Sequence, residues 1–345
     1  MLAFTHSDML LHSGPSGSFE SPERLHYFRK LTEVKTSSYP LYEHFVKLVH
    51  STQYLDVLAE RFRNIGRFRW GCTACSFINT EGDICQMCQS SKPSIQWEYL
   101  NMIDGDTTYI NQYTPQALMA AVVSACELST RIARNKIKNG FALVRPPGHH
   151  ATKDTGQGFC LLNNTAIAAE AALAAGASRI FIFDWDLHHG NGIQDHFYSR
   201  KDVFYCSMHG EGIYPRSGNK DEIGAEAGLG YTLNIPLPKG TGNRSYLSSF
   251  RKEVVPVLKS FNPDLILVAA GFDGLESDPM NFFKLTPEVY ASILEMMKAI
   301  CPKIGLILEG GYDVEMIPVC VERCLSALKG GERCSGARRL LNCPH

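Results

Sequence analysis

From residue 140 onward, short apolar runs alternate with helical stretches, and this alternation constrains the fold most. The runs GFALVRPPGHH, SRIFIFDWDLHHG, DVFYCSMHG, DLILVAAGFDG and IGLILEGGY each start apolar or β-branched and break into glycine and polar residues. Segments between them, such as NNTAIAAEAALAAGA and TPEVYASILEMMKAI, carry apolar residues at three- and four-residue spacing. Repeated strand–helix–strand units of this kind predict a parallel β-sheet covered by helices.

Polar side chains follow the ends of these runs. In open parallel sheets, ligands bind beyond the carboxyl ends of the strands. We therefore expect one crevice to be lined by His149, His150, Asp184, Asp186, His188, Asp273 and Tyr312.

The segment DWDLHHGNG, residues 184–192, places two aspartates and two histidines directly after a buried run. Burying an unpaired carboxylate costs several kcal/mol, so a metal ion is the natural compensating charge. Asp186 and His188 share one face of an extended segment, and Asp273 ends another strand. Two carboxylates and one imidazole with an open position are typical of catalytic zinc, although a D-x-H alone also fits an ordinary turn at a strand end.

The chain before residue 140 is organised differently. We predict helices in PERLHYFRKLTEV, in YPLYEHFVKLVHSTQYLDVLAERF and again in TPQALMAAVVSACELSTRIAR. Residues 66–100 lack helical periodicity and carry CTAC and CQMC nine residues apart. We interpret them as a small module inserted into a loop of a discontinuous domain formed by residues 1–65 and 101–345.

Composition excludes several classes of protein. With 44% hydrophobic and 20% charged residues and a formal net charge of -1, the 345 residues are neither a disordered chain nor one that coats nucleic acid by bulk charge. The start has no signal-peptide pattern, and the apolar runs of about ten residues fall short of the roughly 20 needed to cross a bilayer. We expect a soluble protein of the nucleus or cytoplasm with no membrane partner.

Five of the motifs, in order, resemble those of the zinc-dependent histone deacetylase family: RPPGHHA, GFCLLNN, DWDLHHGNG, AAGFDGLESDP and EGGY. Asn191, where another branch of the family has Asp, makes the chain similar to class II. The resemblance implies a three-layer α/β fold of the arginase/deacetylase type with a central parallel sheet. It also implies hydrolysis of acetyl-lysine on histones or other proteins.

Carried over residue by residue, the resemblance assigns roles to the crevice. Asp186, His188 and Asp273 become the ligands of a catalytic Zn²⁺, and Tyr312 becomes the donor to the transition state. His149 and His150 become the paired histidines, with Asp184 behind the first and Asn191 behind the second. A buried K⁺ site is expected from Asp184, Asp186, His188, Ser207 and Met208.

The chemistry of amide hydrolysis agrees with these roles. The reaction needs an activated water, a stabilised oxyanion and a proton for the leaving amine. Zinc activates the water and polarises the carbonyl, and the phenol of Tyr312 can donate to the oxyanion. The neutral Asn191 leaves His150 less basic than His149, so we expect His150 to be the general base.

Several residues are expected to shape the substrate path. By resemblance, Gly158, Phe159 and Tyr214 wall a narrow tunnel for the lysine stem, where core packing is the other interpretation of Phe159. Met280 stands where the polyamine-selective branch has a glutamate, which favours acyl-lysine. Asp104 or Asp106 matches a rim aspartate that grips the substrate backbone. The family's HPERPERL is here SFESPERL, which keeps Arg24 for the acetate exit but changes the rim loop.

The cysteine pattern indicates a second zinc site. Four of the twelve cysteines lie between residues 72 and 88, as expected for metal binding in a reducing compartment. Cys72, Cys75, Cys85 and Cys88 form two CxxC pairs that can hold a structural Zn²⁺, and the segment resembles the NZF fingers of the Ran-binding-protein zinc-finger superfamily. In ubiquitin-binding members the docking positions correspond to Ser76, Phe77 and Met87.

Alternatives remain for both parts of the chain. The finger could instead pack against the larger domain, or bind RNA through Arg61, Arg63, Arg67 and Arg69, which alternate with aromatic residues. The larger domain could be a catalytically weak scaffold that binds acyl-lysine, although the presence of Tyr312 disfavours this. Amidino hydrolysis on an arginase-like fold would need a two-metal site richer in carboxylates.

Overall fold

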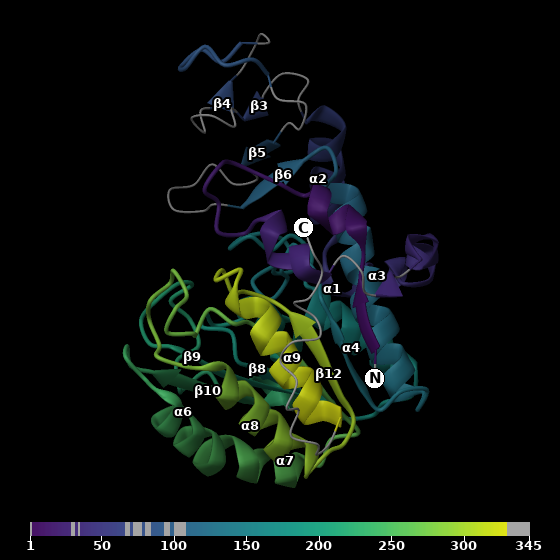
Figure 1. Cartoon of the computed structure of the whole chain (residues 1–345). Helices are drawn as coiled ribbons and strands as arrows, with labels where there is room; N and C mark the ends of the chain where they lie inside the picture. Colours follow the sequence, from purple (N-terminus) through teal and green to yellow (C-terminus); the bar gives the residue numbers. More distant parts are fainter. Residues whose placement is uncertain are drawn as a thin grey trace.

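A parallel β-sheet with helices on both faces organises the chain (Figure 1). The computed structural model describes residues 2–28, 32–33, 35–65, 70–71, 78–79, 84–92, 97–99 and 108–329. Within these ranges the eight-stranded sheet has the order β10-β9-β8-β11-β12-β7-β1-β2, and every neighbouring pair is parallel. The strands are β1 (Leu2–Thr5), β2 (Thr32–Glu33), β7 (Asn139–Ala142), β8 (Ile180–Asp184), β9 (Val203–Gly210), β10 (Thr232–Leu237), β11 (Leu265–Ala270) and β12 (Ile304–Leu308).

Helices form the two outer layers. On one face, α3 (Thr114–Ala133) packs against α4 (Asn164–Ala174), and both contact the sheet. The other face carries α6 (Asn243–Ser249), α7 (Val255–Phe261), α8 (Pro287–Lys298) and α9 (Met316–Lys329) (Figure 1). The central strands β8, β11 and β12 are buried at every residue, because helices cover both of their faces.

The repeated strand–helix pattern of the second half of the chain is confirmed. Each of the five apolar runs contains a strand, and the helices expected between them are α4 and α8. The sequence interpretation missed β1, β2 and β10, which also belong to the sheet.

The first 65 residues depart from the predicted continuous helices. Pro22–Phe28 is a short 3-10 helix that is followed by β2, not by further helix. The second predicted helix is divided into α1 (Glu43–Val49) and α2 (Thr52–Asn64), after a 3-10 turn at Thr36–Leu41. His50 interrupts it: its backbone is extended, and its buried ring pairs with the carbonyl oxygen of Thr152 at 2.9 Å and accepts from the N–H of Asn163 at 2.9 Å.

Short antiparallel pairs lie away from the large sheet (Figure 1). β3 (Trp70–Gly71) pairs with β4 (Ile78–Asn79), and β5 (Trp97–Tyr99) pairs with β6 (Tyr109–Asn111). Cys72, Cys75, Ser76, Phe77, Asp104, Asp106, Arg67 and Arg69 lie outside the described residues. Throughout the described part of the chain, no helix combines the length and apolar character needed to cross a bilayer.

Candidate active site

The carboxyl ends of the central strands bring together the polar residues that follow them. Register places Asp184, the last residue of β8, between Ser207 of β9 and Ala269 of β11. Asp273 lies three residues beyond β11, and Glu309 directly follows β12. Residues distant in sequence therefore meet at one edge of the sheet, as expected for an open parallel sheet.

Asp186, His188 and Asp273 converge on one point. Their possible ligand atoms all lie within 4.8 Å of one another. Nδ1 of His188 is 2.9 Å from Oδ2 of Asp273 and 3.3 Å from Oδ1 of Asp186. Both carboxylates are fully buried, whereas the imidazole is 16% exposed.

The donor set fits a zinc ion. Burial, reinforced by the negative charge of Asp186, raises the pKa of Asp273 to about 7, so a cation is needed to keep both carboxylates ionised. A Cβ on Gly271 or Gly310 would lie 2.0 or 2.6 Å from Oδ2 of Asp186, so only glycine lets the main chain pass behind this carboxylate. Two oxygens and one imidazole nitrogen with an open position match catalytic zinc.

The two neighbouring histidines differ in basicity. Their rings are 3.9 Å apart. Nδ1 of His149 is 3.2 Å from the Asp184 carboxylate, whereas Nδ1 of His150 is 2.9 Å from the amide oxygen of Asn191. Burial opposes protonation of both rings, but Asp186 and Asp184 overcome it at His149 and raise its pKa to about 10.

At His150, burial and then the positive charge of His149 lower the pKa well below its ordinary value. The neutral Asn191 adds no compensating charge. His150 is therefore neutral, and its Nδ1–H donates to Asn191. This leaves Nε2 with a lone pair that can accept a proton.

Tyr312 lies in a loop after β12. Its ring is 5.9 Å from that of Phe159, and the guanidinium carbon of Arg24 is 5.2 Å from its centre. Burial raises the pKa of Tyr312 well above its ordinary value, and the carboxylate of Asp273 adds to the effect. The phenol stays protonated and can act as a hydrogen-bond donor.

Asp278, which the motif analysis quoted but did not assign, fixes the backbone of the Tyr312 loop. Its buried carboxylate accepts from the N–H groups of Tyr312 at 2.7 Å, Asp313 at 3.2 Å and Met280 at 3.0 Å. One side chain thereby ties the loop after β11 to the loop after β12. The S-D-P sequence after Asp273 gives no sign of this, because the main partner is 34 residues away.

Asp278→Asn is expected to lower kcat about tenfold while zinc content stays the same, because the amide NH₂ faces N–H groups that need an acceptor. Steady-state kinetics together with metal analysis checks this. Glu276→Gln, an exposed carboxylate two residues away, serves as the control. A kcat within twofold of wild type would show that Tyr312 does not depend on this anchor.

Two of the expected tunnel walls, Gly158 and Tyr214, lie next to His150, and Phe159 lies next to Tyr312. A Cβ on Gly158, whose φ is +56°, would lie 2.6 Å from the ring of His150 and 3.0 Å from that of Tyr214, so the close approach requires glycine. The Tyr214 ring lies 5.0 Å from His150. Phe159 also has positive φ and donates its N–H to Thr108 at 2.8 Å, while Met280 is half-buried.

Arg24 is fully buried beneath the Tyr312 loop. It donates to the carbonyl oxygens of Gly311, at 2.7 Å, and of Glu309. It also pairs with Glu20, which accepts two further bonds from Arg145 at 2.8 and 2.7 Å. The sequence analysis did not identify Glu20 and Arg145 as a buried pair. Each is a charged residue in a short motif, FES or RPP, and each can be buried because it forms an ion pair with the other.

The predicted potassium site shares Asp186 and His188 with the zinc site. Ser207 and Met208 are both buried in β9, and Oγ of Ser207 is 2.8 Å from Nδ1 of His209. Asp184 uses its Oδ1 to accept from the N–H of Asp186 at 3.1 Å. The K⁺ site stays a prediction.

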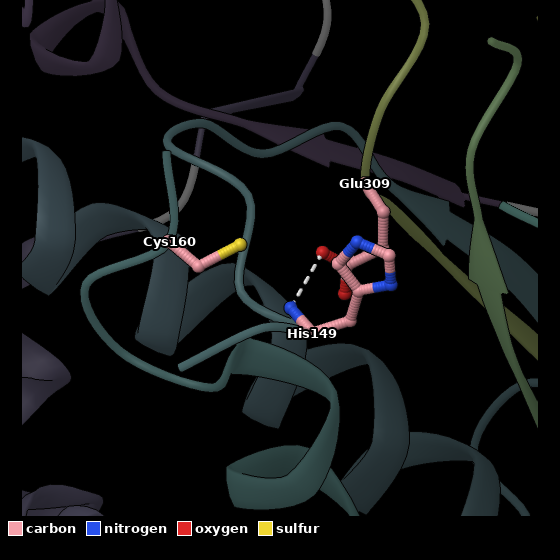
Figure 2. Close-up of side chains that lie close together, drawn as sticks. All are labelled: His149, Cys160 and Glu309. Atoms are coloured by element: carbon pink, nitrogen blue, oxygen red, sulfur yellow. Dashed lines mark hydrogen bonds between the residues drawn. The ribbon is translucent and has the colours of Figure 1, made fainter. Parts of the chain in front are cut away.

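A second buried group, His149, Cys160 and Glu309, also has metal-ligating atoms close together (Figure 2). The Glu309 carboxylate is already engaged: it accepts from the N–H groups of Gly148 at 2.6 Å and His149 at 3.0 Å, and from the hydroxyl of Thr165 at 2.8 Å. Burial raises the pKa of the Cys160 thiol well above its ordinary value, which disfavours the thiolate needed for ligation. Glu309 therefore supports the His149 backbone.

Solved structures with a similar overall fold define the fold class of this chain. The HDA15 HD domain matches with a TM-score of 0.80 and 30% identity over 96% of this chain and 91% of that one. An acetylpolyamine aminohydrolase from Burkholderia pseudomallei matches with a TM-score of 0.79 and 26% identity over 96% and 99%. The fold is that of the arginase/deacetylase class, as the sequence predicted.

Sequence comparison narrows the class to a family. Residues 18–328 match the histone deacetylase domain. Histone deacetylase 15 from Arabidopsis thaliana is 42% identical over 65% of this chain, and histone deacetylase 9 from Homo sapiens is 39% identical over 67%. The chain spans 41% and 24% of the lengths of these two relatives. It belongs to the histone deacetylase family.

Proposed function

We propose that the chain hydrolyses Nε-acetyl-lysine side chains of histones or other proteins in the nucleus or cytoplasm. One observation carries this: a zinc-type donor set lies beside two histidines of opposite basicity and a protonated phenol. An acyl-lysine binder without catalysis would have no use for this set of proton-transferring groups.

Asp186, His188 and Asp273 would hold the zinc ion, which supplies Lewis acidity toward the carbonyl and the attacking water. Nε2 of His150 accepts the proton of that water. The hydroxyl of Tyr312 donates to the developing oxyanion. His150 then returns its proton to the leaving lysine amine, and the charge of His149 favours the anionic transition state.

Met280 favours acyl-lysine over a polyamine as the substrate. In support, the rings of Tyr214 and Phe159 lie close to His150 and Tyr312, and Met280, with a half-buried thioether, would line the same path. A polyamine carries several cations, and a buried cation needs a carboxylate as its partner. An acetylated lysine stem is neutral and fits an apolar wall.

Turnover of acetyl-lysine peptides tests the proposal directly. The purified protein is expected to release acetate in a reaction that a hydroxamate chelator stops and that added zinc restores. An acetylated polyamine provides the competing substrate. Faster turnover of the polyamine, or the absence of turnover on both, would contradict the proposal.

We further propose that residues 66–100 form a zinc finger held by Cys72, Cys75, Cys85 and Cys88. The second cysteine pair supports it: Cys85 donates its N–H to the carbonyl of Ser90 at 2.7 Å and accepts from the N–H of Gln89 at 3.0 Å. Gln89 has a φ of 61°, so the chain turns tightly just after Cys88. Metal analysis is expected to give two zinc ions per chain, one of which is lost in the double variant Cys72→Ser, Cys75→Ser.

The finger would bind ubiquitin through Ser76, Phe77 and Met87. In support, the side chains of Met87 and Ile84 are 65% and 56% exposed, which puts two large apolar groups within three residues of each other at the turn. The patch is small, so we expect a Kd on the order of 100 μM.

Titrating ¹⁵N-labelled ubiquitin with the full chain checks this binding. Met87→Ala and Phe77→Ala are expected to remove the chemical-shift changes, whereas Val57→Ala, another exposed apolar side chain, leaves them. If no shifts occur at millimolar protein, the finger has a structural role. RNA binding that disappears when Arg67 and Arg69 are neutralised would instead assign it to RNA.

A further inference from the structure

The aromatic side chain of Phe19 lies beside Tyr312 and has no role in the proposed reaction. Its ring is 6.0 Å from the Tyr312 ring, and 48% of the side chain is exposed. The Tyr312 ring is thus flanked by Phe159 at 5.9 Å and by Phe19 at the surface. Phe19 stands in SFESPERL where the family pattern has proline, so it accounts for part of the altered rim loop.

The backbone that carries Phe19 is firmly held. The next residue, Glu20, is fully buried, and its carbonyl oxygen accepts from the hydroxyl of Tyr109 at 2.6 Å and from Ser18 Oγ at 3.2 Å. Its carboxylate accepts from Arg145 through both oxygens. The bonds of Glu20 therefore hold the backbone next to Phe19 in place, while the apolar ring of Phe19 remains half exposed.

We propose that Phe19 is a specificity-determining residue that contacts an apolar side chain next to the acyl-lysine of the substrate. This rests on the proposed deacetylase function. The lysine stem must pass inward to reach Tyr312, so groups at the outer edge of Tyr312 meet the parts of the substrate that stay outside. A half-exposed phenyl ring offers no polar atom, so it gains binding energy by burying apolar surface.

The charged groups behind Phe19 compensate one another. The carboxylate of Glu20 pairs with the guanidinium groups of Arg24 and Arg145, and Arg24 also interacts with the carboxylate of Asp278. The half-exposed ring of Phe19, and not a charge, is therefore the feature that this surface offers to the residue next to the acetyl-lysine.

Kinetics on matched acetyl-lysine peptides, with Leu, Gly, Asp or Lys next to the acetyl-lysine, tests the proposal. Phe19→Ala is expected to lower kcat/KM about fivefold to tenfold for the Leu peptide, mainly through KM. The Gly and Asp peptides should change by less than about twofold, and Phe19→Leu should retain most of the preference. Leu229→Ala, an exposed apolar residue ahead of β10, is the control.

Three results would overturn the proposal. An equal fall in kcat for all four peptides would mean that Phe19 only supports Tyr312. Unchanged kinetics for all of them would mean that the ring contacts no substrate, and a preference for the Lys peptide would mean that it binds cations. The Kd of each peptide is measured by fluorescence anisotropy as well. If the wild-type protein binds these peptides but does not hydrolyse them, the proposed deacetylase function fails. The role of Phe19 is then still decided by comparing the Kd of the Leu peptide with that of the Gly peptide.

Discussion

Tyr312→Phe is expected to lower kcat by about 10² to 10³, because the substitution removes one donor to the oxyanion and leaves the ring in place. The protonated phenol lies beside Arg24 and Phe159, and its backbone is held by Asp278. Zinc content and the KM for an acetyl-lysine peptide should change little, since the ligand atoms belong to other residues.

Single-turnover kinetics and metal analysis on the same preparation check this result. Tyr42→Phe offers a control, because this side chain is buried and its hydroxyl donates to the carboxylate of Glu127 in α3, at 2.9 Å. A Tyr312→Phe enzyme with near-normal kcat would assign the stabilisation of the oxyanion to another group.

His150→Ala is expected to be more damaging than His149→Ala, with a loss in kcat of about 10³ against about 10². The neutral imidazole of His150 can accept the proton of water, whereas His149, with a pKa near 10 and Asp184 behind it, is already charged. His149 would contribute as a fixed positive charge.

The pH dependence of the two variants separates these roles. His149→Ala should retain the acidic limb of the kcat/KM profile, which reports the base, and His150→Ala should lose it. The single variant Asn191→Asp tests the assignment of His150 as the base. A carboxylate behind His150 should raise the pKa of His150 and move the acidic limb of the kcat/KM profile to higher pH. If His149→Ala is the less active enzyme, the general base is His149.

Local patterns in the sequence were enough to predict the five central strands of the sheet and the position of the site. Apolar runs of β-branched residues that end in glycine specify buried parallel strands, and the carboxyl ends of such strands must share an edge. Asp184, Asp186, His188 and Asp273 could therefore be placed together before any coordinates were known. The family motifs added the roles of the individual residues.

What the sequence did not reveal depends on partners far away in the chain. Arg145 and Glu20 are 125 residues apart and are buried only as a pair. Asp278 acts on backbone N–H groups, which carry no side-chain signature. The break at His50 results from bonds to Thr152 and Asn163, more than 100 residues away, so local helix propensity alone could not show it.

The carboxylates at the sheet edge also bind one loop to the next. Glu309 accepts from the loop after β7, Asp273 from Leu187 at 2.9 Å in the loop after β8, and Asp186 from Gly310 at 2.7 Å after β12. None of these contacts is local in sequence, so none can form before the parallel strands have paired. The catalytic centre would then assemble late and all at once during folding, and a newly synthesised chain would become competent for zinc only when the last strand, β12, has joined the sheet.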